Sequence, residues 1–410
     1  MKKVINQGRI LAAILGALGS IPAMANLDAV PGEFVVKMKP GAMHSLSAIA
    51  ALKTDRLDEE TFLVKGSTLP SLRANKAVEK AEPNYLYRSL SALDWSLENS
   101  GQADCGGAQG TAGIDVKAND AWKITKGSEQ VIVAVIDTGV EISSPRLRDK
   151  IQVNQAEAGG QPGVDDDRNG FIDDTYGFDF VSESGITADE NGHGTFCAGA
   201  IASALTENDG VAGLSPNVKI LPVRFLNSAG EGTLANAIKA IDYSVSRGAK
   251  VLSNSWGGGQ HSALLEESIQ RAKEAGVVFV AAAGNNGSSN DRYAVYPASY
   301  ALSNVIAVTA VDNKGQLPYF ANTGSSVHIA APGVNMLGLQ RDGTTTCASG
   351  TSMAAPLVAA AAGLMLSQNP ALSPEAVKEK IIRSATPLPA LAGKVASGGM
   401  LNAYGALLGL

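Results

Sequence analysis

From about residue 130 onward, short apolar runs alternate with segments of helical periodicity, and this alternation limits the chain to few folds. The runs are nearly all apolar and rich in Val, Ile and Ala, as in strands that are buried on both faces. Apolar residues at helical spacing lie between them, at 233–246 and 262–275. The alternation predicts an α/β fold with a mostly parallel sheet covered by helices. The runs expected to form strands are 131–136, 218–225, 250–253, 277–282, 305–311 and 327–331.

Residues 1–25 have the pattern of a secretory signal peptide. Three cationic residues lie within the first nine positions, and the apolar stretch that follows ends in an Ala-Met-Ala cleavage pattern at 23–25. Two glycines and a proline interrupt this stretch, which is shorter than the roughly 20 residues that a membrane-spanning helix needs. We therefore expect cleavage after Ala25, a secreted product, and no membrane attachment after processing.

The composition excludes several functional classes. A net charge of −6 argues against nucleic-acid binding, which needs a basic face to neutralise phosphates. Three cysteines are too few for a disulfide scaffold, and the four histidines form no HExxH pair, so a zinc peptidase of that type is excluded. With 45% hydrophobic and 18% charged residues, the chain has enough apolar material for a large core.

Residues 26–94 differ in composition from the rest and are predicted to form a small α+β domain. A strand is expected at 30–38, a helix at 46–52, and an edge strand interrupted by a proline at 78–87. A unit of about 70 residues is small for a domain that is stable on its own. The segment is therefore interpreted as an N-terminal accessory domain.

Three residues with possible catalytic roles lie at the ends of predicted elements. Asp137 directly follows the run 131–136, at the carboxyl end of a strand, where α/β sheets place their sites. His193 lies between two glycines at the start of a small-residue helix, and Ser352 immediately precedes the apolar helix 353–366. Each of them alone is equally explained as a turn, capping or packing residue.

The motifs around these residues are far more specific when they are considered together. They read Val-Ile-Asp-Thr-Gly at 135–139, Gly-His-Gly-Thr at 192–195 and Gly-Thr-Ser-Met-Ala-Ala-Pro at 350–356. This order of Asp, His and Ser is that of subtilisin. The chain resembles the subtilisin-like serine protease (subtilase) family over about 26–410, and a fourth motif at 281–287 matches the stretch that carries the family's oxyanion-hole asparagine, here Asn285.

The resemblance implies a three-layer subtilisin-like fold and a serine endopeptidase that acts on polypeptides through an acyl-enzyme. Ser352 is the expected nucleophile and His193 its general base. Asp137 would hold the imidazole in one tautomer and stabilise its charged form. Asn285 and the backbone N–H of Ser352 would stabilise the oxyanion of the tetrahedral intermediate.

The family's substrate-binding edge resembles the stretch Ser255, Trp256 and Gly257, whose backbone would pair with an extended peptide. Trp256 would flank the first specificity pocket, and Gly284 would lie in the opposite wall. An ordinary core tryptophan is the alternative for Trp256. The walls carry no charged residue, which favours a hydrophobic side chain at P1 of the substrate.

An acidic loop is the candidate metal site. Its D-x-D-x-N-G opening, from Asp165 to Gly170, offers hard oxygen ligands around a glycine turn, as Ca²⁺ requires. The twelfth position is Tyr176 rather than Glu, so the loop is not an EF-hand, and a solvated acidic turn is the alternative. The resemblance implies structural calcium here, whereas another calcium site of the family is in doubt because Arg146 replaces its aspartate. The expected ligands are Asp165, Asp167, Asn169, Asp173 and Asp174.

The resemblance also assigns the remaining parts of the chain. Residues 26–94 would be a propeptide that assists folding and blocks the cleft as an intramolecular inhibitor, and 95–410 would be the catalytic domain, a monomer. The processing cut is expected between about 87 and 110. Cys197 is expected to be a free buried thiol beneath the active site, while the pairing of Cys105 with Cys347 stays open. The other histidines, His44, His261 and His328, are expected to be packing or surface residues.

Two alternatives compete with the endopeptidase. The first is a catalytically inactive subtilase-fold binding protein, which would normally lack one of the four residues that this chain keeps. The second is an α/β-hydrolase esterase, but Ala354 occupies the place of the second glycine of its G-x-S-x-G motif. The charge distribution also favours the metal site. Residues 157–190 alone carry a net charge of −9, whereas the acidic and basic residues in the rest of the expected catalytic domain are equal in number.

Overall fold

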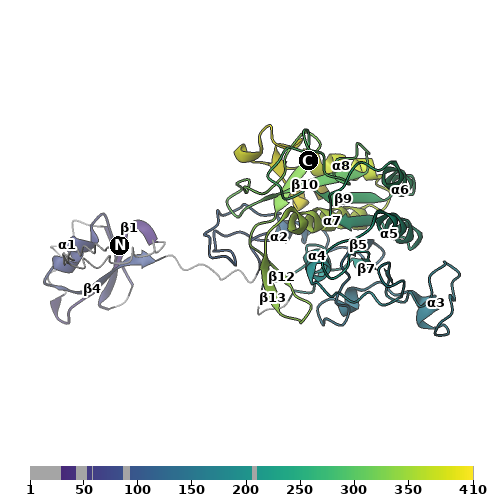
Figure 1. The fold of residues 1–410 in the computed structure, drawn as a ribbon. Coiled ribbons are helices and arrows are strands. Elements are labelled where there is room, and N and C mark those ends of the chain that lie inside the picture. The colour runs from purple at the N-terminus through teal and green to yellow at the C-terminus, as the bar shows by residue number, and fades with distance from the viewer. Residues whose placement is uncertain (1–28, 43–52, 58, 86–92, 206–209, 410) are drawn as a thin grey trace, which may run out of the picture. The chain divides into compact units, whose positions relative to one another are not determined.

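The computed structural model describes residues 29–42, 53–57, 59–85, 93–205 and 210–409. The chain forms two compact units, one ending at Leu90 and the other beginning at Ser91 (Figure 1). The expected signal peptide and the helix predicted at 46–52 lie outside the described residues.

Within its described residues, the smaller unit is an antiparallel sheet of four strands in the order β2-β3-β1-β4, with one short helix. Strand β4 lies at the edge, as its proline predicted, whereas β2 and β3 were not predicted. The apolar side chains of Val36, Phe62 and Leu72 form part of its small core. The elements are β1 (Ala29–Met38), β2 (Lys53–Arg56), β3 (Thr61–Lys65), α1 (Leu69–Ala74) and β4 (Val78–Tyr85).

The larger unit is built on a nine-stranded sheet in the order β14-β15-β11-β10-β9-β8-β5-β7-β6. Each neighbouring pair is parallel except β14 with β15, which confirms the predicted mostly parallel sheet. The strands are β5 (Ile132–Asp137), β6 (Phe178–Asp179), β7 (Lys219–Arg224), β8 (Val251–Asn254), β9 (Val278–Ala282), β10 (Val305–Val311), β11 (Ile329–Pro332), β14 (Thr386–Pro387) and β15 (Gly399–Met400).

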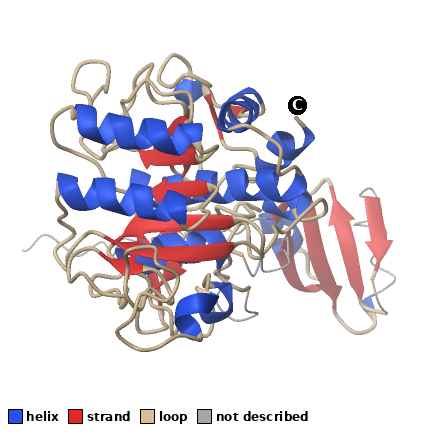
Figure 2. Cartoon of the chain, turned by 90° about the vertical axis from the view of Figure 1, so that its right-hand side faces the viewer, coloured by secondary structure: helices blue, strands red, loops and turns tan. Residues whose placement is uncertain are grey.

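Helices cover both faces of this sheet and complete three layers (Figure 2). Helices α5 and α6 pack on one face, and α4 and α7 pack on the other. The helices are α2 (Ala118–Ala121), α3 (Gln155–Ala158), α4 (His193–Ala202), α5 (Leu234–Ser246), α6 (Ala263–Glu274), α7 (Thr351–Gln368), α8 (Pro374–Arg383) and α9 (Ala403–Leu408), with 3-10 turns at Arg148–Lys150 and Pro389–Leu391.

Burial on both faces explains why the predicted strands read as apolar runs. In β5, Val133 and Val135 contribute to the core beneath α4 and α7, while Ala134 and Ile136 contribute to the core beneath α5 and α6. Because successive side chains point to opposite faces, neither set can be polar. The strands that correspond to predicted runs, β5 and β7 to β11, begin and end within two residues of them, whereas the short strands β6, β14 and β15 were not predicted.

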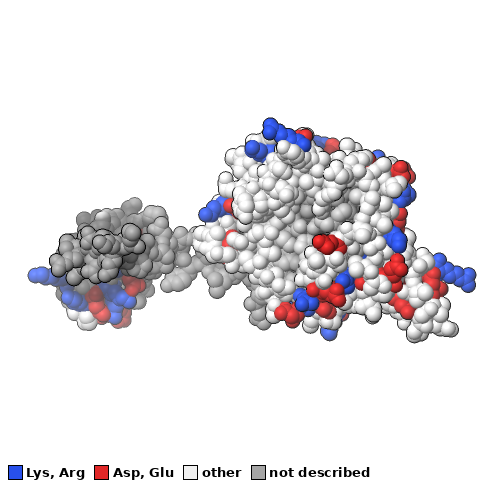
Figure 3. Space-filling view, viewed as in Figure 1, with Lys and Arg blue, Asp and Glu red and all other residues white. Residues whose placement is uncertain are grey.

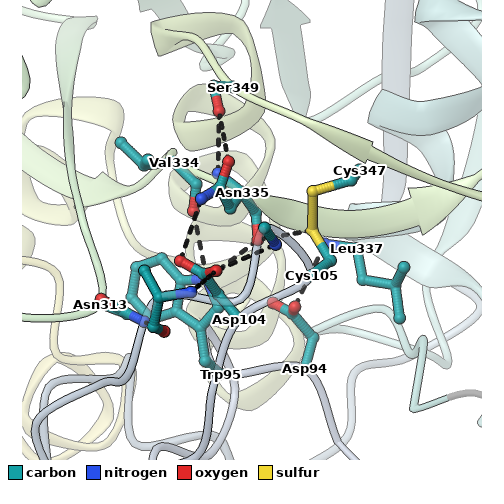
Figure 4. Close-up of a disulfide and its surroundings, with 12 residues drawn as sticks. Asp94, Trp95, Asp104, Cys105, Asn313, Val334, Asn335, Leu337, Cys347 and Ser349 are labelled. Carbon is teal, nitrogen blue, oxygen red and sulfur yellow. Dashed lines mark hydrogen bonds between the residues drawn. A yellow bond between two sulfur atoms is a disulfide. The ribbon is translucent and has the colours of Figure 1, made fainter. Parts of the chain in front are cut away.

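A two-stranded hairpin, β12 (Met336–Leu339) with β13 (Thr345–Ala348), packs against α4. A disulfide joins Cys105 to Cys347 on this hairpin, which resolves the pairing that the sequence left open. Figure 4 shows Trp95 and Asp94 beside it: the indole Nε1 donates to the carbonyls of Val334 and Asn335, and the Asp94 carboxylate accepts from the backbone of Leu337. Asp94 and Trp95 are thus bonded to the hairpin and to the residues directly before it.

Among the described residues, one helix is long and apolar enough to cross a membrane by length and composition. This helix is α7, and 83% of the relevant window is buried inside the protein. It is the central core helix of the larger unit.

Candidate active site

Asp137, His193 and Ser352 lie at the end of one strand and at the starts of two helices, near the carboxyl end of the inner strand β5. Strand β5 lies between β7 and β8, so the order of the strands reverses there, and ligand sites of α/β sheets collect at such a switch point. Asp137 is the last residue of β5, and His193 is the first residue of α4. The sequence predicted that the helix begins at 353, directly after Ser352. The observed helix α7 begins two residues earlier, at Thr351, so Ser352 is its second residue.

Asp137 and His193 form a hydrogen-bonded pair. The imidazole Nδ1 of His193 lies 2.7 Å from Oδ1 of Asp137, whose side chain is 1% exposed. The second oxygen, Oδ2, has no hydrogen-bond partner among the described residues. The Asp137 carboxylate raises the pKa of His193 well above its ordinary value, against the opposing effect of burial. The pair is therefore arranged to stabilise an imidazolium.

Pro356 explains an unusual feature of the backbone at Ser352. In a regular helix, the N–H of residue 356 would donate to the carbonyl of Ser352, but proline has no N–H. The freed carbonyl instead accepts from the Ser255 hydroxyl at 2.9 Å and lies 3.6 Å from the Cys197 thiol. Two side chains from other elements thus replace the missing helical hydrogen bond.

The Ser352 hydroxyl donates to the backbone carbonyl of Ser255 at 3.0 Å in this structure. Ser352 and His193 both line a cavity of about 480 Å³, so the nucleophile and the imidazole face the same hollow although this hydroxyl is bonded to Ser255. Catalytic hydrogen bonds are often unmade until substrate is bound.

Asn285 lies in the same cavity, three residues after the end of β9. Its side-chain oxygen accepts from both the backbone N–H and the hydroxyl of Thr351, at 2.9 and 3.0 Å. This fixes the amide so that its NH₂ group is the part left for a ligand. The preceding Gly284 has φ +112°, and a Cβ there would lie 2.5 Å from the Asn322 side chain, so glycine is required.

The remaining walls of the cavity include the predicted substrate-binding residues. Trp256, Gly257 and Gly284 all line it, and its lining contains no Asp, Glu, Lys or Arg. Trp256 is half-buried, stacks edge-on against Phe225 with centroids 4.8 Å apart, and also lines a neighbouring cavity of about 550 Å³. It therefore forms part of the surface between two adjoining hollows rather than the interior of the core.

Two further predictions about single side chains are confirmed. Cys197 is a free, buried cysteine whose sulfur lies 4.0 Å from Nδ1 of His193, and burial raises the pKa of its thiol. His328 is a packing residue: its Nδ1 accepts from the backbone of Ala307, and burial lowers its pKa to about 3.

The acidic loop brings some of its predicted ligands together. Carboxylate oxygens of Asp165 and Asp167 lie within 4.8 Å of each other and of the Glu157 carboxylate. Backbone N–H groups hold all three, for example Gly170 on Asp165 at 2.8 Å. Acidic side chains gather on this side of the larger unit, where α3 lies (Figure 3). Three converging carboxylates are a donor set that suits a hard cation.

Asp173 and Asp174 do not join that group. Asp174 is fully buried and pairs with Arg247, Nη1 to Oδ2 at 2.5 Å, and also accepts from the Tyr243 hydroxyl. The carboxylate of Asp173 accepts from the backbone N–H of Gly163. The Asn169 amide donates to Asp167 and Asp174 and so links the two sets.

Arg146 supplies a positive charge at the place where a second calcium site was in doubt. Its guanidinium donates to the carbonyl oxygens of Ala204, at 2.9 Å, and of Val211. A cation bound to these same carbonyls would be repelled by this guanidinium.

Sequence reasoning missed several residues of the site. Glu157 lies before the D-x-D motif and contributes to the acidic group only because the loop folds back onto α3. Thr351 is adjacent to Ser352 and holds Asn285, but no spacing rule distinguishes it from a helix-capping residue. Asp189, which lies four residues before His193, is buried and accepts several hydrogen bonds. A buried aspartate in a glycine-rich loop has no sequence signal of its own.

Comparison with known proteins agrees with this geometry. The model of the subtilase family matches residues 128–406. A thermophilic serine proteinase of Bacillus sp. (strain AK1) is 36% identical over 83% of this chain and 79% of its own length. Thermitase of Thermoactinomyces vulgaris is 36% identical over 62% of this chain and 80% of its own. The crystal structure of a cold adapted subtilisin-like serine proteinase superposes with a TM-score of 0.58 at 28% identity, over 76% of this chain and 97% of that one.

Proposed function

This chain belongs to the subtilase family and is a serine endopeptidase, and from that premise we propose that Asp137, His193 and Ser352 are its catalytic triad. The observation that carries the proposal is the 2.7 Å contact between a buried carboxylate and the imidazole, in a cavity shared with Ser352. Retention of all four expected residues, including Asn285, disfavours an inactive binding protein. The absence of charge in the cavity lining favours a hydrophobic P1 side chain.

The chemistry follows from these groups. The Ser352 hydroxyl gives its proton to Nε2 of His193 as its oxygen attacks the substrate carbonyl carbon. The Asp137 carboxylate stabilises the imidazolium that forms. The Asn285 amide and the Ser352 N–H, in the first turn of α7, stabilise the oxyanion. The imidazolium then protonates the leaving amine, and water hydrolyses the acyl-enzyme by the same route. All of these groups come from one chain, so a monomer suffices.

We also propose that the acidic loop binds a structural calcium ion through Glu157, Asp165 and Asp167, with Asn169 beside them. Their oxygens are hard donors held close together by backbone hydrogen bonds. Glu157 takes the place that Asp173 and Asp174 had in the prediction. A bound ion would offset the mutual repulsion of the three carboxylates and so stabilise the loop.

We also propose a zymogen organisation, in which the propeptide begins at residue 26 and ends slightly before the boundary at 94 that the sequence predicted. Leu93 and Trp95 are buried in the core of the larger unit, and Asp94 is bonded to the hairpin β12–β13. A cut after these residues would remove core side chains from the enzyme. We therefore place the processing cut on the N-terminal side of Leu93, which shortens the expected range of 87–110.

Export is proposed on two grounds. The first 25 residues have the pattern of a signal peptide. Independently, Cys105 and Cys347 form a disulfide, a bond that persists in oxidising compartments outside the cytosol.

The test compares the purified full-length wild type with Ser352→Ala. The wild type should process itself and cleave denatured casein, while Ser352→Ala should remain unprocessed and inactive although folded. N-terminal sequencing of the processed wild type should give Leu93 or an earlier residue as the first residue. If Ser352→Ala cleaves casein as fast as the wild type, the assignment of the nucleophile fails.

A further inference from the structure

We propose that Asp189 is a positioning residue for catalysis, because its carboxylate joins the strand end that carries Asp137 to the helix start that carries His193. The inference rests on the proposed triad and adds a residue that touches neither substrate nor reacting atoms. Asp189 is 4% exposed. A buried carboxylate is costly unless its oxygens are hydrogen-bonded.

Five donors satisfy this carboxylate, and all belong to the two segments of the catalytic pair. They come from one residue beside Asp137 and from the turn and first helical residues around His193. The donors are the Thr138 hydroxyl at 2.9 Å, the backbone N–H groups of Asn191, Gly192 and Thr195 at 3.0, 2.8 and 2.9 Å, and the Thr195 hydroxyl at 2.6 Å.

Through these contacts Asp189 caps helix α4. The N-cap residue is Gly192, which has no side chain with which to accept the free N–H groups of the first turn. Asp189 accepts from the N–H of Gly192 and of Thr195, and its negative charge is favourable at a helix N-terminus. The backbone of His193, the first helical residue, is therefore fixed from both sides.

Thr138 transmits the same constraint to Asp137. Its backbone N–H donates to Oδ1 of Asp137 at 2.7 Å, the oxygen that also binds the imidazole. Its hydroxyl donates to Asp189 and accepts from the N–H of Gly194 at 3.0 Å. A Cβ on Gly194 would lie 3.1 Å from that of Asp137, so strand end and helix start are packed closely. Loss of the Asp189 carboxylate would release both partners.

Contacts of Arg224 indicate that the Asp189 carboxylate is not needed to hold its own loop in place. It lies opposite Asp137 in the register of β5 with β7, and its guanidinium donates to the carbonyl of Ala188 at 3.2 Å. The loop that carries Asp189 is thus attached to the sheet independently of the Asp189 carboxylate. Changing that carboxylate should disturb the orientation of the imidazole more than it disturbs folding.

The experiment uses Asp189→Asn, Thr138→Val and Thr138→Ser in the full chain, with Ser352→Ala as blank. A trace of wild-type enzyme processes each variant, and stoichiometric fluorophosphonate labelling counts active sites. kcat per active site and KM are then measured on a peptide amide. Misplacement of catalytic groups by about 1 Å lowers rates roughly 100-fold. We expect kcat to fall roughly 10- to 100-fold in Asp189→Asn and Thr138→Val, with KM within about threefold, while Thr138→Ser, which keeps the hydroxyl, stays within about threefold in kcat.

Equal kcat per active site in Asp189→Asn and the wild type would overturn the proposal, because a structural role lowers only the number of active sites. If Asp189→Asn does not fold, the proposal is tested by comparing Thr138→Val with Thr138→Ser. Equal kcat values in these two variants would also overturn the proposal. A wild type that takes no label would instead contradict the proposed triad, so the two failures are distinguishable.

Discussion

The hydroxyl of Ser255 donates to the backbone carbonyl of Ser352, and the hydroxyl of Ser352 donates back to the backbone carbonyl of Ser255. The first of these bonds exists because Pro356 cannot donate to that carbonyl. A predicted substrate-binding serine is therefore also the residue that holds the backbone of the nucleophile.

Replacing Ser255 by alanine should weaken this support. A hydrogen bond of this kind contributes about 1 kcal/mol, and the weaker contact of the Cys197 thiol with the carbonyl would remain. We expect the rate of fluorophosphonate labelling to fall roughly fivefold, since about 1 kcal/mol corresponds to that factor. Ser367→Ala is the matched control, because its hydroxyl binds a carbonyl further along α7. Equal labelling rates in Ser255→Ala and the control would contradict the role.

The pH dependence of the reaction should report the pair Asp137–His193. His193 accepts a proton only when neutral, so the rate falls as pH drops through its pKa, which Asp137 raises. The other titratable group in contact, Cys197, is buried beside it. Asp137→Asn should shift the acid limb of kcat/KM to lower pH and reduce kcat by roughly 10⁴-fold, the loss known from trypsin-like enzymes. An acid limb that does not move would contradict the assigned pairing.

The Asn285 amide should act only in the transition state. Asn285→Ala removes the amide donor together with the oxygen that accepts from buried Thr351, so we expect a stability loss of about 1 kcal/mol, while kcat should fall about 10²- to 10³-fold at similar KM, a range established on subtilisin. Asn286→Ala is the control: it shortens the neighbouring amide side chain of the same cavity and keeps the backbone N–H that donates to Asn322. Steady-state kinetics of both variants test whether Asn285 stabilises the transition state. A rise in KM alone would indicate a role in substrate binding instead.

Calcium should stabilise the folded enzyme. With free ion at about 100 times its Kd, binding adds about 2.7 kcal/mol to the free energy of unfolding. EGTA should therefore lower the thermal midpoint of the wild type, and the double change Asp165→Asn with Asp167→Asn should abolish that difference. Asp149→Asn, at an exposed carboxylate elsewhere, should keep it. A wild-type midpoint that EGTA leaves unchanged removes the metal proposal.

The fold was predictable from the sequence because the central strands are buried on both faces, so runs such as 305–311 carry an unbroken apolar signal that matches β10. Strands β2 and β3 of the smaller unit escaped prediction. Strand β2 (Lys53–Arg56) is short and mostly charged, so no apolar run distinguishes it from a loop, and the apolar run in β3 (Thr61–Lys65) is only three residues long.

The site was predictable where function depends on residues within one motif, as for His193 and Ser352. The site was not predictable where a side chain acts by contacting another that is distant in the sequence. Glu157 and Asp189 each contact residues of a loop that folds back toward them. Asp174 pairs with Arg247, which lies at the end of α5. Such pairings arise from tertiary contacts that periodicity and spacing do not encode.

The central claim is that Ser352 is the nucleophile activated by His193. Peptide mapping by mass spectrometry after treatment with a fluorophosphonate tests it most directly. The account predicts one adduct per wild-type molecule, on the peptide that contains Ser352, and no adduct in His193→Ala on the same timescale. An adduct on a different residue, or labelling of His193→Ala at the wild-type rate, would contradict it.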